Sequence, residues 1–457
     1  MADKRIAVIG GGISGLSVLH YLNQRNTERA LDLCLFEKNA SSGGTIATQR
    51  KNDCIFEAGP NGFLDSNERT LQLVKEVDAE RFLVRASEVH ADRFISLDGW
   101  LLALPTDPKE FFRFKALSLW DKLRVSLEYF IGKGKKDPET IYKFGVRRFG
   151  RKFTELFLDP MVSGVFGGDV KKLNLRLAFP RIYDMEQLHG SLIKAMLKAQ
   201  KAKQRGEEVN SVMPRGKLTS FTSGMGCLIG SLQEKYKEQI HFGKQVVSVT
   251  YADNRYKIAL EDRTEYADEV YLCTPAYVTQ RIVKEMWPEL AKDLGKIYYA
   301  PVAVVNLVFW KELLEVIPQG FGYLVPSLEK RAVLGVLFEN NIFPGRCPDD
   351  KFMFRVMIGG ANHPDVVKLT EKELVQMAKR EILAHFNVKG DAQDISVKLW
   401  DKGIPQYDQV YYEAIQSIER KMSLPKNLHL VANYLNGIAM NDCINNAYRA
   451  VQNSHLL

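Results

Sequence analysis

The sequence lacks the patterns typical of disulfide-stabilised, zinc-binding and membrane-spanning proteins. Its six cysteines are scattered along 457 residues without a Cys-x-x-Cys pair, and its eight histidines show no His-x-x-x-His spacing. This argues against a disulfide framework or a metal site and fits a reducing compartment. No apolar run approaches the length of about 18 residues needed to span a bilayer. With no signal peptide before the first strand, the protein is expected in the cytoplasm or peripherally on the inner face of the cell membrane.

Strong charge of one sign is also missing. Lysine and arginine number 63 against 55 acidic residues, which leaves a net charge of +8 spread over 457 residues. Such an excess permits attraction to anionic lipid or acidic small molecules, but it does not indicate nucleic-acid binding. A hydrophobic content of 46% is ordinary for a folded protein. The length predicts two or three domains.

The N-terminal region has the pattern of a dinucleotide-binding βαβ unit. Residues 6–9 form an apolar run typical of a buried strand, and a helix with an apolar face is expected soon after it. Three glycines lie where such a unit tolerates no Cβ, namely Gly10, Gly12 and Gly15. The amides at the start of the helix, with the helix dipole behind them, predict a phosphate-binding site.

A carboxylate follows at the spacing expected for ribose binding. Residues 31–36 form a second apolar strand, which ends at Glu37. A carboxylate at this position accepts hydrogen bonds from the ribose hydroxyls and repels a 2′-phosphate, so it favours FAD or NAD. The alternative is a glycine-rich turn without a ligand.

Two further glycine turns decide between these dinucleotides. Gly43 and Gly44 follow Glu37 by a few residues, and the segment 56–62 (FEAGPNG) comes soon after. NAD enzymes have no need of a second glycine loop here, whereas an extended FAD uses it for its phosphates and ribityl chain. We therefore expect FAD, the alternative being two ordinary surface turns.

The order of strand and helix patterns predicts an α/β and α+β chain. We expect a two-dinucleotide-binding-domain FAD fold with a separate β-sheet substrate domain and a helical insert. The expected boundaries are 1–88, 212–280 and 398–457 for a discontinuous FAD-binding domain, 89–109 and 281–397 for the substrate-binding domain, and 110–211 for the insert.

One stretch of the insert has two interpretations. Between residues 117 and 131, apolar side chains recur at helical spacing, and lysines follow at Lys133, Lys135 and Lys136. Aromatic residues with flanking lysines suit a membrane interface. A core helix whose charged side chains reach the solvent would show the same pattern.

Four blocks spread over nearly the whole chain carry a resemblance to a known family. They are 159–169 (DPMVSGVFGGD), 319–326 (QGFGYLVP), 404–407 (IPQY) and 437–444 (GIAMNDCI). With them the chain resembles the flavin-dependent protoporphyrinogen oxidases and the related oxygen-dependent coproporphyrinogen III oxidases of the same fold. The block at 159–169 lies in the helical insert, which amine oxidases and carotene desaturases do not share.

The resemblance implies one non-covalent FAD per chain and a tetrapyrrole pocket. The cofactor contacts that it implies are Gly10, Gly11, Gly12, Ile13, Ser14, Gly15, Glu37, Lys38, Gly44, Thr45, Gly59, Pro60, Asn61, Gly62, Val246, Trp400, Ile438, Ala439 and Met440. The substrate-binding residues that it implies are Arg93 for a propionate, Asn61 beside the substrate, and Phe321, Gly322, Leu324 and Met357 as apolar walls.

The implied reaction is the six-electron oxidation of protoporphyrinogen IX to protoporphyrin IX with O2 as acceptor, in haem biosynthesis. No residue is expected to act as a strong base or nucleophile, because the flavin carries the redox chemistry. Further partners on this interpretation are the inner face of the membrane and the next haem-pathway enzyme. The alternatives are oxidation of coproporphyrinogen III to coproporphyrin III and a non-catalytic relative that resembles the GDP-dissociation inhibitors.

Overall fold

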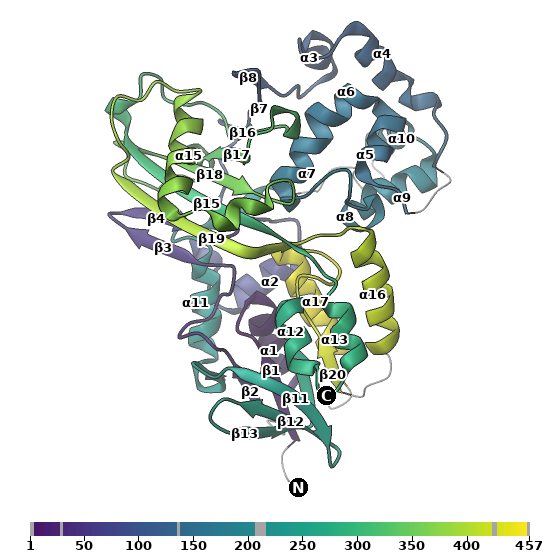
Figure 1. Cartoon of the computed structure of the whole chain (residues 1–457), viewed down its shortest axis with the longest axis vertical. Coiled ribbons are helices and arrows are strands. Elements are labelled where there is room, and N and C mark those ends of the chain that lie inside the picture. Colours follow the sequence, from purple (N-terminus) through teal and green to yellow (C-terminus); the bar gives the residue numbers. More distant parts are fainter. Residues whose placement is uncertain (1–3, 28–30, 135–137, 206–215, 423–426, 455–457) are drawn as a thin grey trace.

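The computed structural model describes residues 4–27, 31–134, 138–205, 216–422 and 427–454. Figure 1 shows three parts: an α/β part that contains both described ends of the chain, a second part built on a large sheet with α15, and a helical part with α3 to α10. This arrangement agrees with the expected fold class. Lys135 and Lys136 lie outside the described residues.

A five-stranded parallel sheet forms the centre of the first part. Its strand order is β10 (Ile240–His241), β2 (Leu31–Phe36), β1 (Lys4–Ile9), β14 (Glu269–Leu272) and β20 (Leu428–Leu430). Segments from the start, middle and end of the chain therefore share one sheet, because Ile6 pairs with Glu269 and Val270 pairs with Leu428.

Each face of this sheet is covered by a different layer. The alternation of side chains sends Ile6 and Val8 to one face and Ala7 and Ile9 to the other. The first face packs against α1 (Ile13–Arg25), α2 (Glu68–Glu76), α11 (Gly226–Lys235) and α17 (Met440–Gln452). The second packs against β11 (Val246–Ala252), β12 (Arg255–Leu260), β13 (Thr264–Ala267), α12 (Ala276–Val283), α13 (Pro288–Leu294) and α16 (Gln409–Met422).

The second part is a mixed sheet of seven strands. Their order is β19 (Asp394–Pro405), β15 (Tyr299–Trp310), β18 (Lys351–Gly359), β17 (Val333–Phe338), β16 (Gly322–Leu324), β7 (Arg93–Leu97) and β8 (Trp100–Ala103). Helix α15 (Glu371–Leu383) packs on one face through Leu374, Ala378 and Ile382. The opposite face meets the hairpin β3 (Thr48–Lys51) and β4 (Cys54–Glu57), where Cys54 and Phe56 pack against Val308 and Met353. The expected domain boundary at residue 398 falls inside β19, and the division into domains stays a prediction.

The third part is the helical insert. Its main helices are α3 (Pro108–Arg113), α4 (Leu119–Ser126), α5 (Ile141–Phe149), α7 (Asp159–Phe166), α9 (Pro180–His189) and α10 (Leu192–Gln204). Arg148 is fully buried, and its guanidinium contacts the buried carboxylates of Glu128 and Glu186. Within the described ranges, no helix combines the length and apolar character needed to span a bilayer.

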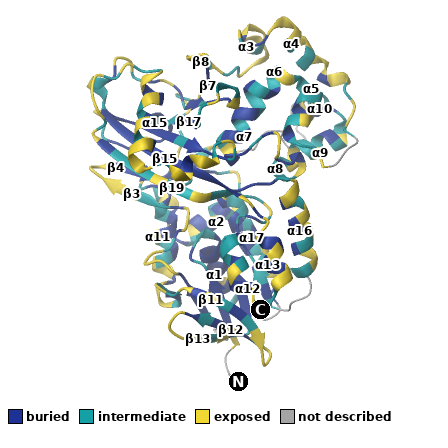
Figure 2. Cartoon of the chain, viewed as in Figure 1, coloured by how far each residue is buried: buried dark blue, intermediate teal, exposed yellow. Residues whose placement is uncertain are grey.

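The outer helices of the insert expose large apolar side chains. Figure 2 shows α3 and α4 at the far edge of this part with much exposed surface. Leu119, Trp120 and Phe130 are 80%, 79% and 77% exposed, whereas Leu117 is buried. Within the stretch 117–131, Leu117 therefore packs inside the protein, whereas Leu119, Trp120 and Phe130 form an exposed apolar surface.

Candidate functional site

The first glycine turn leaves a helix N-terminus open to a ligand. Gly10 has a φ of +107°, and a Cβ on Gly15 would lie 1.9 Å from the Gly10 carbonyl oxygen. These two positions therefore require glycine. Gly12 is the N-cap of α1, no side chain caps this end, and nothing lies within 4 Å of where its Cβ would be. The amides of the first turn are left to bind an anion, as expected for a phosphate of FAD.

The three glycine turns meet at this point. The Gly43 amide donates to the Gly11 carbonyl at 2.8 Å, and Gly12 and Gly43 form a parallel bridge. A Cβ on Gly59 would lie 1.8 Å from the Thr45 carbonyl oxygen, so the third turn packs directly against the second. The structure thus brings the predicted segments 10–15, 44–45 and 59–62 together, although they are separate in sequence.

Glu37 holds the first turn through its buried carboxylate. Its Oε2 accepts from the Gly11 amide at 2.7 Å, while Oε1 accepts from the amide and the side chain of Asn39 at 2.9 and 2.7 Å. The Glu37 amide donates to the His241 carbonyl. Burial, with help from Arg263 and Arg5, lowers the pKa of the His241 imidazole below its usual range.

The C-terminal helix α17 lies beside the first glycine turn. Helix α17 begins at Met440, directly after Ile438 and Ala439, and the Cys443 thiol on it hydrogen-bonds Ser14 of α1. Two helix N-termini therefore lie side by side (Figure 1). Val246 opens β11 two residues after Lys244, whose amide donates to the Glu37 carbonyl. The predicted cofactor residues of α1, β2, β11 and α17 form one continuous region.

Side chains from the second part of the molecule hold the turn 57–62. Trp400 Nε1 donates to the Ala58 carbonyl at 2.7 Å, and Arg355 Nη2 donates to the Gly59 carbonyl. Arg346 Nη2 donates to the Asn61 carbonyl at 3.3 Å. The predicted contact Trp400 thus lies against the segment 56–62, which was itself expected at the FAD site.

The predicted substrate residues lie on neighbouring strands of the seven-stranded sheet. Arg93 pairs with Gly322 across β7 and β16, and the Arg93 guanidinium carbon is 4.9 Å from the centre of the Phe321 ring. Leu324 and Met357 both pair with Gly335 of β17, so they project on either side of a residue without a side chain. The Leu324 side chain lies over Gly335, because a Cβ on Gly335 would be 3.0 Å from Leu324 Cδ2.

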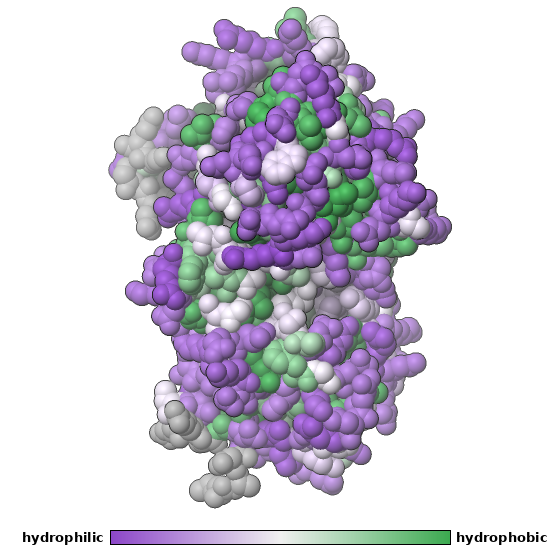
Figure 3. Space-filling model, turned by 90° about the vertical axis from the view of Figure 1, so that its left-hand side faces the viewer, coloured by the Kyte–Doolittle hydropathy of each residue, from purple (hydrophilic) through white to green (hydrophobic). Residues whose placement is uncertain are grey.

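Helix α7 of the insert packs on Leu324. A Cβ on its Gly164 would lie 2.6 Å from Leu324, so the helix backbone packs directly on that side chain. Asn61 lies toward α14 (Glu339–Ile342), where its Nδ2 donates to Glu339 at 3.2 Å. Figure 3 shows a hollow at the waist of the molecule where apolar residues gather.

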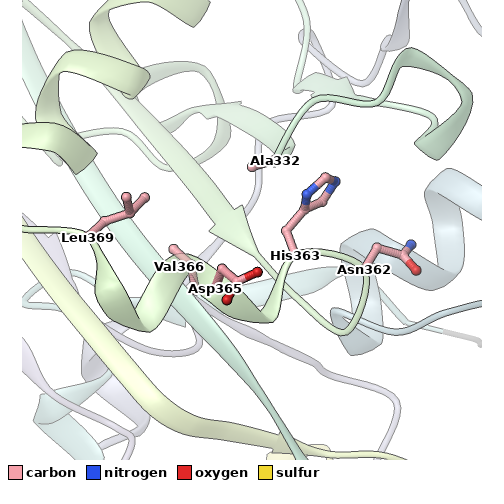
Figure 4. Close-up of a pocket in the computed structure, with 6 residues that line it drawn as sticks. All are labelled: Ala332, Asn362, His363, Asp365, Val366 and Leu369. Carbon is pink, nitrogen blue, oxygen red and sulfur yellow. The ribbon is translucent and has the colours of Figure 1, made fainter.

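A groove of about 180 Å³ elsewhere on the molecule contains none of the predicted site residues. It is lined by Ala332, Asn362, His363, Asp365, Val366 and Leu369 (Figure 4). Among the described residues, no group of three or more His, Cys, Asp or Glu side chains is arranged to hold a metal ion.

Two charged residues at the site, Arg346 and Arg355, escaped the sequence reasoning. Arg346 and Arg355 are both buried, and Arg346 Nη1 is 3.1 Å from the buried Glu57 carboxylate. Burial raises the pKa of the Glu57 carboxyl, although Arg346 opposes the shift. A signal was available for Arg355, since it is a lone charge within the apolar run 352–358 (FMFRVMI). Arg346 lies in a loop with no comparable signal.

Comparison with known proteins agrees with this geometry. The family model for flavin-containing amine oxidoreductases matches residues 13–453. The chain belongs to this family. Its cofactor is FAD, and the uncapped α1 N-terminus with open space beside Gly12 fits such a cofactor.

Relatives of the chain match it over nearly their whole lengths. Protoporphyrinogen oxidase of Bos taurus is 30% identical, with 98% of this chain and 97% of the relative covered. Coproporphyrinogen III oxidase of Bacillus subtilis is 26% identical, with 99% and 98% covered. An Exiguobacterium sp. structure, provisionally named a protoporphyrinogen oxidase, matches with a TM-score of 0.84 at 21% identity, covering 99% and 98%. A reduced UDP-galactopyranose mutase shares the fold with a TM-score of 0.73 at 13% identity, covering 99% and 94%.

Proposed function

We propose that this protein oxidises protoporphyrinogen IX to protoporphyrin IX in an FAD-dependent reaction. The full-length match to a protoporphyrinogen oxidase at 30% identity is the observation that carries the proposal. Six electrons and six hydrogens leave the substrate in three two-electron steps, and three O2 molecules become three H2O2. Bound FAD supplies the hydride-accepting chemistry, and the polypeptide binds and orients the substrate.

The predicted substrate residues suit a tetrapyrrole that carries carboxylates at one edge. The Arg93 guanidinium is exposed, and it can bind a propionate with two parallel hydrogen bonds. Leu324 and Met357 offer apolar contact to the macrocycle, and α7 behind Leu324 excludes water. Asn61 is a neutral donor that can hydrogen-bond the substrate without adding charge.

Coproporphyrinogen III is the alternative substrate, since the Bacillus subtilis relative carries that name. It has four propionates instead of two. Arg93 is the cation among the predicted substrate residues, so the extra carboxylates would be desolvated against apolar side chains such as Leu324 and Met357. We therefore expect protoporphyrinogen IX to be the better substrate.

Porphyrin fluorescence tests this choice directly. Each porphyrinogen is mixed with the purified protein under air, and the rate of porphyrin appearance is corrected for the enzyme-free rate. A higher kcat/KM for protoporphyrinogen supports the proposal. Equal or faster turnover of coproporphyrinogen would assign the chain to the alternative reaction.

The exposed apolar surface of the insert supports peripheral membrane binding. Leu119, Trp120 and Phe130 project from it, and Arg113 and Lys115 are exposed beside them. Aromatic and basic residues at one edge suit the headgroup region of an anionic bilayer. At the membrane, the protein would release its apolar porphyrin product next to the bilayer. Flotation with liposomes of increasing anionic content tests it, and a protein that floats with none of them would contradict it.

A further inference from the structure

Two cysteines from distant parts of the chain lie in contact close to the turn 57–62. Cys54 opens β4, and Cys347 lies in the loop between α14 and β18. Both are free thiols, and the Cys347 thiol donates a hydrogen bond to the Cys54 sulfur. Both side chains belong to the small cluster that joins the β3–β4 hairpin to the seven-stranded sheet. Thiols in contact can be joined by a disulfide without a large movement of the backbone.

A backbone hydrogen bond holds the two segments together beside the thiols. The Ile55 amide donates to the Arg346 carbonyl at 2.8 Å, and these residues are the direct neighbours of Cys54 and Cys347. Chain segments joined by such a bond lie about 5 Å apart, and a disulfide requires Cα atoms about 4.4–6.8 Å apart. The backbone therefore keeps both cysteines within bonding range.

The surroundings of the pair favour a thiolate on Cys54. The hydrogen bond from Cys347 lowers the pKa of the Cys54 thiol against the effect of burial, and the Lys351 ammonium acts in the same direction as the hydrogen bond. The carboxylates of Asp394 and Asp53 oppose it, and the Asp394 carboxylate is 3.6 Å from the Lys351 ammonium. Because the thiolate is the reactive nucleophile, Cys54 is expected to react first.

A surface loop covers the pair. Cys347 is 5% exposed, and Cys54 is fully buried. Gly345 and Asp349, on either side of Cys347 in the same loop, are exposed. A small oxidant therefore needs only a local movement of this loop to reach the sulfur atoms.

We propose that Cys54 and Cys347 are a peroxide-sensitive pair that is converted to a disulfide. The Cys54 thiolate attacks one oxygen of hydrogen peroxide, the O–O bond breaks, and the departing hydroxide takes up a proton. The Cys347 sulfur then attacks the resulting sulfenic acid, and the second oxygen leaves as water. Two thiols are oxidised to one disulfide, and one peroxide is reduced to two molecules of water. The chemistry of the pair needs peroxide from any source, and only its supply by the neighbouring FAD site rests on the proposed function.

The disulfide acts on the turn 57–62 through Arg346. This residue precedes Cys347, and its guanidinium contacts the Glu57 carboxylate and the Asn61 carbonyl. A bond between Cys54 and Cys347 fixes the loop that carries Arg346 to the strand that leads into the turn. It also restricts the unfolded chain, so the oxidised protein should melt at a higher temperature. In a reducing compartment the pair returns to thiols when peroxide is removed.

Peptide mapping of the FAD-loaded protein tests the proposal. The protein is treated with one equivalent of hydrogen peroxide, unfolded in N-ethylmaleimide, digested without reductant and analysed by mass spectrometry. We expect a cross-linked peptide pair that contains Cys54 and Cys347, with the other four of the six cysteines alkylated. The melting temperature should rise in an untreated-versus-treated comparison, and dithiothreitol should reverse both changes.

Three other measurements serve as controls. Cys227 tests simple accessibility, because it is half-buried whereas the other cysteines are buried. Cys34 tests burial, since it is 2% exposed and its thiol donates to the Ile6 carbonyl, and it should stay reduced. Cys347→Ser keeps a hydrogen-bond donor beside Cys54 but removes the second thiol. In this variant peroxide should leave a sulfenic acid on Cys54, which dimedone traps, and the melting temperature should not rise.

The outcomes are distinct. Oxidation of Cys227 with Cys54 and Cys347 both alkylated would overturn the proposal, and the parent protein gives this result even if Cys347→Ser fails to fold. A Cys54–Cys347 disulfide that is already complete before peroxide is added, under reducing conditions, would also overturn it, because the bond would then be a permanent cross-link. A protein that forms the disulfide with added peroxide but produces no porphyrin would contradict the proposed function and leave the pair intact.

Discussion

Replacement of Glu37 by alanine tests the predicted FAD site, because it should change both the stability of the apoprotein and its affinity for FAD. The carboxylate accepts three hydrogen bonds, one from the Gly11 amide and two from Asn39. Asn39 is exposed, so water can replace the lost acceptor for its two donors. Gly11 is buried, and its amide would be left without a partner. The variant therefore loses one buried charged hydrogen bond even before FAD is considered.

The expected magnitude follows from that single bond. A hydrogen bond to a charged group contributes about 1.5–3 kcal/mol, so the free energy of unfolding of the apoprotein should fall by roughly this amount. FAD affinity should fall by roughly 10- to 150-fold, because the acceptor for the ribose hydroxyls is lost as well. The losses in FAD affinity and in apoprotein stability are separate, since only the first involves the ribose.

Two assays measure these losses. Urea unfolding of the apoprotein gives the stability change, and flavin fluorescence during titration gives the dissociation constant. Glu37→Gln is the control, because its amide oxygen can still accept from Gly11 while the charge is gone, so its values should lie between those of the parent and Glu37→Ala. An alanine variant that loses stability but binds FAD as tightly as the parent would refute the ribose role of Glu37.

Three further predictions concern the membrane, the substrate and pH. Trp120→Glu combined with Leu123→Glu should release the protein from anionic liposomes in flotation while its flavin spectrum stays unchanged, and continued flotation would contradict the proposed surface. Arg93→Ala should lower kcat/KM for protoporphyrinogen roughly 10- to 150-fold with FAD still bound, and unaltered kinetics would remove Arg93 from the site. Because the folded state lowers the pKa of His241, the unfolded state takes up the proton first, and stability should fall as the pH drops below about 6.5. His241→Phe keeps the stacking on Phe36 and should flatten this part of the melting-temperature profile, whereas an unchanged profile would contradict the assignment.

The strands and the glycine turns were predictable because local pattern determines them. The run 31–36 was expected as an apolar strand and forms β2 with those bounds, since a continuous apolar stretch fits a strand covered on both faces. The spacing from Gly10 to Glu37 likewise placed the carboxylate at the first turn, where it contacts Gly11. Its role in binding ribose stays a prediction.

Burial and long-range contacts could not be predicted in the same way. Leu117 and Trp120 belong to one apolar periodicity, yet Leu117 lies before the N-cap Ser118 and is buried, while Trp120 is 79% exposed. The difference arises because Leu117 joins a buried cluster with Ile95 and Leu97 of β7, which belong to the seven-stranded sheet and not to the insert. The hydrogen bond between Arg355 and Gly59 joins residues 296 positions apart, so no local pattern could have revealed it.

Anaerobic mixing of the FAD-loaded protein with protoporphyrinogen IX tests the central claim most directly. The account predicts that the oxidised flavin absorbance is lost as porphyrinogen is consumed, and that it returns, with porphyrin fluorescence, when O2 is admitted. Coproporphyrinogen III and a simple primary amine serve as comparison substrates in the same instrument. Flavin that stays oxidised with both porphyrinogens, but is bleached by the amine, would contradict the account.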